Sequence, residues 1–285
     1  MFDPFRPDLL QGKTTIITGG GTGLGRSMAL RLAGLGAKVG LVGRRPDPLN
    51  ETVKAIRDGG GTAAAAPGDV RDPAAVKSAF DELEARLGPA NQLINCAAGN
   101  FLAASEDLSP NAFDAVVRIV LHGTFHCTVE LGRRLIERRQ KGEILAITTT
   151  YSGTGSAFVL PSACAKAGVA ALIRSLAVEW AAYGIRLNAI APGPFPTEGA
   201  FSRLMPGSEM EEQALRRIPS RRFGEHWELT NLAAYLMSDA SPYLTGDEVT
   251  IDGAEALFSG QEFAGFAHLD RGAAKQMLAS LKPKK

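Results

Sequence analysis

A glycine-rich turn stands between an apolar run and a helical pattern near the start of the chain. Residues 13–18 (KTTIIT) are β-rich, GGGTGLG follows, and an amphipathic pattern covers residues 27–35. Glycines let a backbone approach a pyrophosphate, and the next helix offers free N–H groups and positive potential. A glycine cluster alone could be a simple turn, but the order strand, loop, helix favours a dinucleotide site. The residues expected to contact the dinucleotide are Gly19, Gly21, Thr22, Gly23 and Leu24.

Strand and helix patterns alternate along the rest of the chain. Strands are predicted over residues 13–18, 38–42, 62–66, 92–95, 143–148, 186–190 and 248–251, and helices over 27–35, 73–87, 111–139, 162–183 and 227–237. This alternation predicts an α/β fold, a doubly wound parallel seven-stranded (Rossmann) sheet with helices on both faces. The 285 residues, 45% of them hydrophobic, suit a single domain. We expect its core over 12–255, a lid-like insertion over 195–223 and a tail over 261–285.

Charge and cysteine usage exclude several classes of protein. The net charge is +1, so the global basic field of a nucleic-acid-binding protein is absent. Cys96, Cys127 and Cys164 form no CxxC pair, which indicates reduced core residues and predicts no metal site. No membrane-spanning apolar run, signal peptide or peroxisomal tripeptide is recognised in the sequence, so we expect a cytoplasmic protein without membrane insertion.

Two arginines follow the second predicted strand. A ribose with free hydroxyl groups would favour an acidic residue at this position, and the chain has Arg44 and Arg45 instead. Guanidinium groups suit a phosphate monoester, whereas the alternative is a solvated pair at a turn. The absent acid and the present bases agree, and together they predict NADP(H) as the cofactor.

A tyrosine and a lysine flank the end of the fifth predicted strand. Tyr151 follows this strand, and Lys166 lies one turn into the next helix. An ammonium group lowers the pKa of a nearby phenol, so such a pair can supply a proton near neutral pH. A lone Tyr and Lys would more simply be an exposed loop residue and a solvated helix residue. The cofactor motif upstream favours the catalytic interpretation.

These motifs together resemble the short-chain dehydrogenase/reductase family over residues 12–255. The resemblance rests on Thr18-Gly19 with Gly23-Leu24-Gly25, on Asp69-Val70, on Asn95, Ala97 and Gly99, and on Pro192-Gly193-Pro194. The general family carries Tyr-x-x-x-Lys, but here Ser162 stands four residues before Lys166. A tyrosine displaced to the position of Tyr151 resembles the pattern of the 2,4-dienoyl-CoA reductase branch of this family. Two segments of the sequence also resemble that branch, INCAAGNF and AITTTYSGTGSAFVLPSACAKAGV.

The resemblance implies a reaction and a set of site residues. The reaction is NADPH-dependent reduction of a 2,4-dienoyl-CoA to a 3-enoyl-CoA in fatty-acid β-oxidation, with Tyr151 as the acid. His122 replaces the family's asparagine near the thioester oxygen, and a core histidine is the alternative. Ser162 would orient the substrate or a water, or simply satisfy a helix N-terminus. Further cofactor contacts are expected at Asp69, Val70, Asn95, Ala97, Gly99, Lys166, Pro192, Gly193, Phe195 and Thr197, and substrate contacts at Arg71, Phe101 and Arg203.

Three rival functions remain open at this point. A trans-2-enoyl-CoA reductase would use the same cofactor and thioester. A carbonyl-reducing dehydrogenase is disfavoured because Ser162 stands where the usual acid would be. A non-catalytic NADP-binding regulator need not keep Tyr151 and Lys166. The resemblance also implies a homotetramer, and the small residues of 162–183 are compatible with close packing between subunits.

Overall fold

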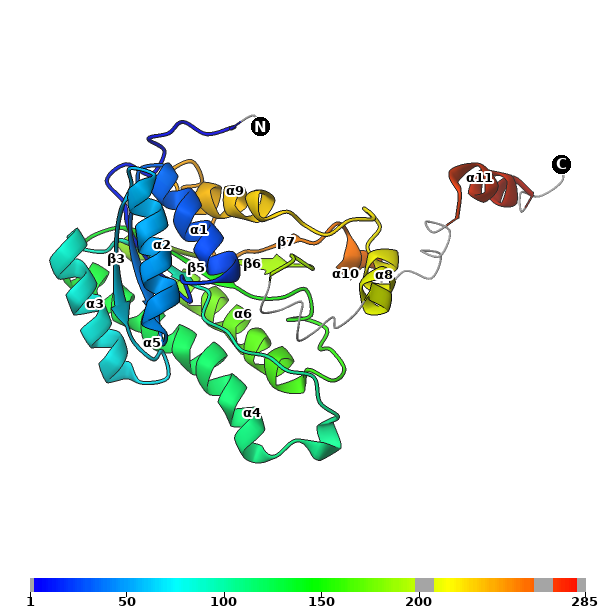
Figure 1. The fold of residues 1–285 in the computed structure, drawn as a ribbon, viewed down its shortest axis with the longest axis horizontal. Helices are drawn as coiled ribbons and strands as arrows, with labels where there is room; N and C mark the ends of the chain where they lie inside the picture. Colours follow the sequence, from blue (N-terminus) through cyan, green and yellow to red (C-terminus); the bar gives the residue numbers. More distant parts are fainter. Residues whose placement is uncertain (1–2, 198–207, 259–268, 281–285) are drawn as a thin grey trace.

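Seven parallel strands form the centre of the molecule. The computed structural model describes residues 3–197, 208–258 and 269–280. The strand order is β3-β2-β1-β4-β5-β6-β7, and every neighbouring pair is parallel (Figure 1). The strands are β1 Thr14–Thr18, β2 Lys38–Gly43, β3 Thr62–Pro67, β4 Gln92–Asn95, β5 Gly142–Ile147, β6 Ile185–Pro192 and β7 Glu248–Ile251. The predicted seven-stranded doubly wound fold is confirmed.

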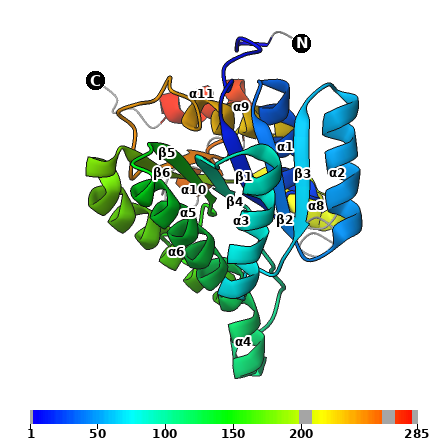
Figure 2. The ribbon, with the colours of Figure 1, turned by 90° about the vertical axis from the view of Figure 1, so that its left-hand side faces the viewer.

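Helices cover both faces of this sheet, as Figures 1 and 2 show. On one face α3, α4, α5 and α6 bury their apolar sides in one core cluster, and on the other α1, α2 and α9 form a second cluster. Such two-sided burial is typical of parallel sheets, whose strands read as nearly continuous apolar runs. The helices are α1 Gly23–Gly34, α2 Pro46–Asp58, α3 Pro73–Leu87, α4 Pro110–Val117, α5 Gly123–Glu137, α6 Leu160–Trp180, α8 Ser208–Arg217, α9 His226–Leu236, α10 Glu255–Phe258 and α11 Arg271–Ser280.

Several helices differ from the prediction. Helix α2 was not predicted, because its prolines at the first positions imitate a turn although they are compatible with a helix start. The single helix predicted over 111–139 is divided into α4, a π-helical turn at Arg118–His122, and α5. Helix α8 lies inside the lid-like insertion expected over 195–223, and α11 lies in the tail expected over 261–285.

Helix α6 is apolar enough to need separate comment. With the short 3-10 turn that follows, Leu160–Tyr183 has the length and composition of a membrane-spanning helix, which the sequence analysis did not expect. Half of the most apolar 18-residue stretch of this helix is buried inside the protein. Ala165, Val169 and Ile173 belong to the core cluster beneath the sheet. We therefore interpret α6 as a core helix, because its apolar side already has partners in the fold.

Strand β3 forms one edge of the sheet, and two arginines occupy its outward carbonyl groups. Arg57 donates through Nε and Nη2 to the Ala63 oxygen at 3.1 and 2.8 Å. Arg86 donates through Nη1 to the Ala65 oxygen at 3.4 Å. Open strand edges present unpaired backbone groups that can pair with another chain. Here the side chains of α2 and α3 take part of that pairing capacity.

Candidate active site

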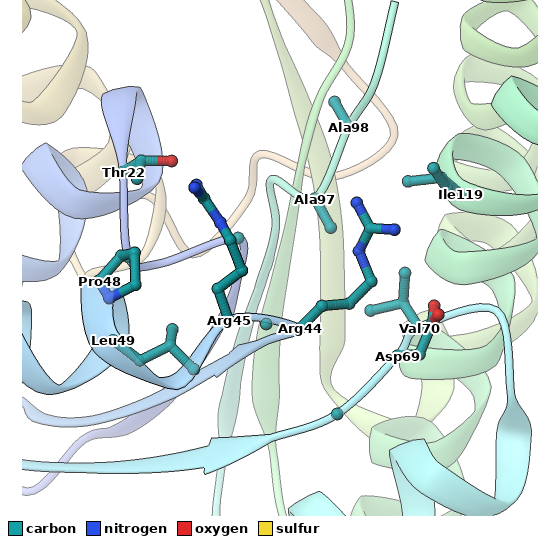
Figure 3. A pocket seen from close by; sticks show the side chains of 14 residues that line it. Thr22, Arg44, Arg45, Pro48, Leu49, Asp69, Val70, Ala97, Ala98 and Ile119 are labelled. Atoms are coloured by element: carbon teal, nitrogen blue, oxygen red, sulfur yellow. The ribbon is translucent and has the colours of Figure 1, made fainter. Parts of the chain in front are cut away.

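The candidate site lies at the carboxyl ends of the parallel strands. In this strand order β1 and β4 are neighbours, and the chain runs outward from them in both directions. Ligands of doubly wound sheets bind in the crevice at such a switch point. A pocket is found there (Figure 3), lined by Gly19, Gly21, Thr22, Gly43, Arg44, Arg45, Pro48, Leu49, Gly68, Asp69, Val70, Ala97, Ala98 and Ile119. Eight of these residues were predicted as cofactor contacts. The other six were not, and they come from the end of β2, the start of α2, the loops after β3 and β4, and the π-helical turn at Arg118–His122.

The glycine loop allows close backbone packing next to this pocket. Gly19 has φ of 69°, and a side chain there would also press on the backbone of Ala97 at 3.0 Å. A Cβ at Gly25 would overlap the Gly19 carbonyl group, so both positions require glycine. The side chain of Thr22, the N-cap residue of α1, makes no capping hydrogen bond, and the first turn of α1 contains no acidic residue. By contrast Asp72 caps α3 and Ser109 caps α4. The free N–H groups of α1 therefore suit an anion.

The two arginines extend from the end of β2 into the pocket. Figure 3 shows Arg45 reaching toward Thr22, and Arg44 rising beside Ala97. Both are exposed, and neither forms a hydrogen bond or ion pair with residues that the structure describes. Asp69 on the facing loop is held by Arg71 at 2.5 Å, and this hydrogen bond keeps the pKa of the Asp69 carboxyl below its usual range. The pocket thus keeps two free guanidinium groups for a phosphate.

The tyrosine and serine singled out from the sequence meet beyond β5. The Tyr151 hydroxyl lies 3.2 Å from Ser162 Oγ, at the start of α6. Tyr151 is half-buried, whereas Ser162 is buried. The turn after β5 and the first turn of α6 therefore bring together two groups that are eleven residues apart. Either hydroxyl can donate, so Ser162 can orient the Tyr151 proton.

Lys166 is buried one helical turn after Ser162. Its ammonium donates a hydrogen bond to the carbonyl oxygen of Ile147, the last residue of β5. Burial lowers the pKa of Lys166 to about 8. No hydrogen bond joins Tyr151 to Lys166 within the described residues, so any influence of the lysine on the phenol acts through space. A charged lysine at neutral pH still places positive potential beneath the site.

Two buried oxygens near the strand ends have no partner. Within the described parts of the chain these are Asn95 Oδ1 and Thr149 Oγ1. The Asn95 amide nitrogen is satisfied, because it donates to Thr128 Oγ1 at 2.9 Å. Thr149 lies between Ile147 and Tyr151 and was not predicted; three successive threonines after a strand were its only signal in the sequence. Buried polar groups are rarely left unpaired, so these oxygens are compatible with a ligand at this edge.

His122 lies at the end of the π-helical turn. Its ring is exposed and meets His126 edge-on, with centroids 6.3 Å apart. His126 in turn has Nδ1 2.9 Å from the Val70 carbonyl oxygen, beside the cofactor pocket. The described residues provide no hydrogen bond to His122. Its proposed contact with a thioester oxygen stays a prediction, although π-helical turns frequently occur at functional sites.

The turn after β6 is fixed from two sides. The Gly193 N–H donates to Ile251 O at 3.0 Å, and the Gly224 N–H donates to Pro194 O at 3.1 Å. Phe195 is buried in the second core cluster. Thr197 lies next to the glycine loop, because a Cβ at Gly23 would be 3.4 Å from its methyl group. The predicted nicotinamide contacts therefore lie next to the predicted phosphate contacts.

The remaining predicted residues are placed less directly. Leu24 lies in the first turn of α1 and packs on the second core cluster, and Gly99 lies beside Ile119. Phe101 packs against the first core cluster. Arg71 is engaged by Asp69. Arg203 falls outside the described residues, so its contact with coenzyme A is untested.

Several known proteins are similar to this chain over most of its length. Over 92% of the chain it is 46% identical to an uncharacterized oxidoreductase of Caenorhabditis elegans and 39% identical to a probable 2,4-dienoyl-CoA reductase, (3E)-enoyl-CoA-producing, of the same species; it spans 85% and 87% of these relatives. It is 42% identical to a probable 2,4-dienoyl-CoA reductase, (2E)-enoyl-CoA-producing, of Bacillus subtilis, over 87% of this chain and 98% of that one.

Solved structures and a family model point the same way. A gluconate 5-dehydrogenase from Burkholderia cenocepacia, in complex with NADP and tartrate, matches with a TM-score of 0.83 and 31% identity, covering 88% of this chain and 98% of the other. The family model described as enoyl-(acyl carrier protein) reductase matches residues 19–254. With the strand order and the glycine loop described above, these matches show that the chain is an oxidoreductase of the short-chain dehydrogenase/reductase family.

Proposed function

We propose that this protein reduces 2,4-dienoyl-CoA thioesters to 3-enoyl-CoA with NADPH. The observation that carries the proposal is the 3.2 Å contact between Tyr151 and Ser162 above the buried Lys166. Ser162 occupies the position where carbonyl-reducing members of the family carry their acid. The phenol of Tyr151 lies within hydrogen-bonding distance of Ser162. The relatives described as probable 2,4-dienoyl-CoA reductases support this substrate class.

The cofactor would be held by groups around the carboxyl ends of the parallel strands. The N-terminus of α1 and the glycine loop would bind the pyrophosphate. Arg44 and Arg45 would bind the 2′-phosphate, which favours NADPH over NADH. Lys166 would bind the nicotinamide ribose, and the backbone at Phe195 would hold the carboxamide. When bound, NADPH supplies a hydride to the far carbon of the conjugated system.

The protein would then stabilise the negative charge on the substrate and supply a proton to it. Negative charge collects on the thioester oxygen as a dienolate, and hydrogen-bond donors aimed at that oxygen lower the barrier. Tyr151 and His122 are the proposed donors. Tyr151 gives its proton to the α-carbon, which yields the 3-enoyl product. Ser162 orients the Tyr151 hydroxyl, and Lys166 supplies positive potential while it stays protonated.

Coenzyme A would contact one aromatic side chain and two arginines. We propose that Phe101 packs on the thioester or pantetheine arm, and that Arg71 and Arg203 contact phosphates. Arg71 would have to share its guanidinium with Asp69, because both Asp69 oxygens already accept from it. A partly exposed Arg71 side chain keeps some donor groups open to solvent.

A second candidate is a trans-2-enoyl thioester reductase. It is favoured by one observation, the description of the matching family model as an enoyl-(acyl carrier protein) reductase. The two reactions share the cofactor, the thioester and the charge on the oxygen. They differ in which carbon accepts the hydride, so the substrate assay below separates them.

The test is NADPH consumption, followed by absorbance, with a 2,4-dienoyl-CoA and with a 2-enoyl-CoA. Loss of a positioned proton donor should lower kcat of Tyr151→Phe by about 10²–10⁴-fold. Tyr243→Phe is the matched control, since Tyr243 is fully exposed. Turnover of the enoyl substrate alone would favour the second candidate. Full activity of Tyr151→Phe on the dienoyl substrate would contradict the proposed acid.

Two further expectations stay predictions. We propose a homotetramer, and exposed apolar side chains on the helices beneath the sheet are compatible with an interface, among them Phe125 and Val178. Sedimentation of the purified chain measures the assembly. The cytoplasmic location is likewise a prediction, to be checked by fractionation.

A further inference from the structure

His226 connects three elements that meet at the proposed cofactor site. It is the first residue of α9, and its half-buried ring makes two short hydrogen bonds. Nδ1 lies 2.6 Å from Ser27 Oγ on α1, and Nε2 lies 2.7 Å from the Pro196 carbonyl oxygen. The ring therefore joins α9, α1 and the turn after β6.

The chemistry of the two contacts fixes their direction. A carbonyl oxygen only accepts, so Nε2 must carry a proton and donate to Pro196. Nδ1 of a neutral ring then accepts from the Ser27 hydroxyl. Nδ1 of a charged ring would donate to the same oxygen, while Ser27 donates to the Gly23 carbonyl oxygen, 3.2 Å away. The connection persists in both charge states of the ring, so we interpret it as a permanent tie.

The tie acts where the two halves of the cofactor site meet. Ser27 lies in the first turns of α1, whose N-terminus faces the proposed pyrophosphate position. Pro196 lies between Phe195 and Thr197, at the proposed nicotinamide position. The Gly224 N–H binds Pro194 O just before α9, so α9 and its leading turn hold two carbonyl groups of the same segment.

We propose that His226 is a positioning residue that sets the distance between the nicotinamide and pyrophosphate halves of the site. This inference rests on the proposed NADPH-dependent function. It predicts a selective defect: without the ring, the Pro194–Thr197 segment loses the hydrogen-bonded link that His226 makes to α1. A ligand that spans both halves then binds more weakly. A ligand that occupies only the Arg44 half should not be affected.

The experiment measures dissociation constants of purified native and variant proteins for NADP⁺ and for adenosine 2′,5′-bisphosphate by calorimetry. His226→Ala should weaken NADP⁺ binding about three- to tenfold, the range expected for a lost hydrogen bond, with the bisphosphate unchanged. Asn231→Ala is the matched control, because Asn231 accepts from Arg31 Nε at 2.9 Å and also joins α1 to α9, without touching Pro196. This control should bind both ligands as the native chain does.

Other outcomes would overturn the inference in distinguishable ways. Unchanged NADP⁺ affinity in His226→Ala, or equal loss of both ligands, would leave His226 with at most a structural role. A native chain that binds neither ligand would refute the cofactor assignment itself. If His226→Ala does not fold, Ser27→Ala is the second variant. It keeps the hydrogen bond between His226 and Pro196 and removes the hydrogen bond between His226 and α1. It should weaken NADP⁺ alone, and an unchanged NADP⁺ affinity would again refute the tie.

Discussion

Replacing Lys166 by methionine should make the unliganded protein more stable at pH 7. Burial lowers the pKa of Lys166 from its ordinary value of 10.5 to about 8. At 1.36 kcal/mol per unit, charging this lysine costs the folded state about 3 kcal/mol at neutral pH. Methionine has a similar length and no charge, but the Ile147 carbonyl group then loses its donor, which costs about 1 kcal/mol. The expected net gain is about 2 kcal/mol.

The sign of the effect follows from the proton balance. Between about pH 8 and 10.5 the folded chain has released this proton and the unfolded chain still holds it. The unfolded state then binds more protons, so the contribution of Lys166 to native stability rises with pH across this window. At pH 10 only about 1 kcal/mol of the charging cost remains, by the same linkage. The advantage of methionine should therefore vanish there.

Urea unfolding without cofactor, at pH 7 and pH 10, measures both free energies. The difference between native protein and Lys166→Met removes all other titrations that the two share. Lys54→Met is the control, since that side chain is 77% exposed and should give the same small difference at both pH values. An equal difference at both pH values for Lys166→Met, or a clear loss of stability at pH 7, would refute the reasoning. The variant should also bind NADPH poorly, so stability and function would move in opposite directions.

Four other variants test separate parts of the structure. Arg44→Ala should raise KM for NADPH about tenfold and leave KM for NADH nearly unchanged, because the guanidinium is free for the 2′-phosphate; initial rates with both cofactors measure this. Ser162→Ala should lower kcat about tenfold with KM for NADPH unchanged, since only the hydrogen bond to the proposed acid is lost; a matching rise in that KM would contradict this role. Gly132→Ala should lower the free energy of unfolding by about 1–3 kcal/mol, because a Cβ there overlaps the Trp180 ring. Gly34→Ala, with nothing within 4 Å of its Cβ, should raise it by up to about 1 kcal/mol.

The parts of the molecule that the sequence predicted are encoded over short distances. Strand periodicity, the glycine loop and the pair Arg44–Arg45 each lie within a few residues, and so do Ser162 and Lys166 on one helical turn. Local sequence patterns of this kind determine local structure with little influence from the rest of the fold. Parallel pairing then brings their ends to one edge, which is why the predicted cofactor residues meet in one pocket.

The parts that the sequence did not predict depend on contacts across the fold. An apolar periodicity cannot distinguish an α-helix from one with a π-helical turn, so the turn at Arg118–His122 was missed. The burial of the Thr149 hydroxyl depends on how β5 and α6 pack. The bonds of His226 join residues about 200 and 30 positions away in the chain. No local signal marks such pairs.

The guanidinium groups at β3 also limit how copies of this protein can associate. A foreign strand that approached this edge would have to displace Arg57 from the Ala63 oxygen and Arg86 from the Ala65 oxygen before it could pair. Each displaced guanidinium would need new partners or water, so the encounter begins with a loss of bonds. The two arginines therefore oppose strand addition at this edge of the sheet. At high concentration in a crowded compartment, this barrier favours separate, correctly folded molecules over an extended sheet shared between them.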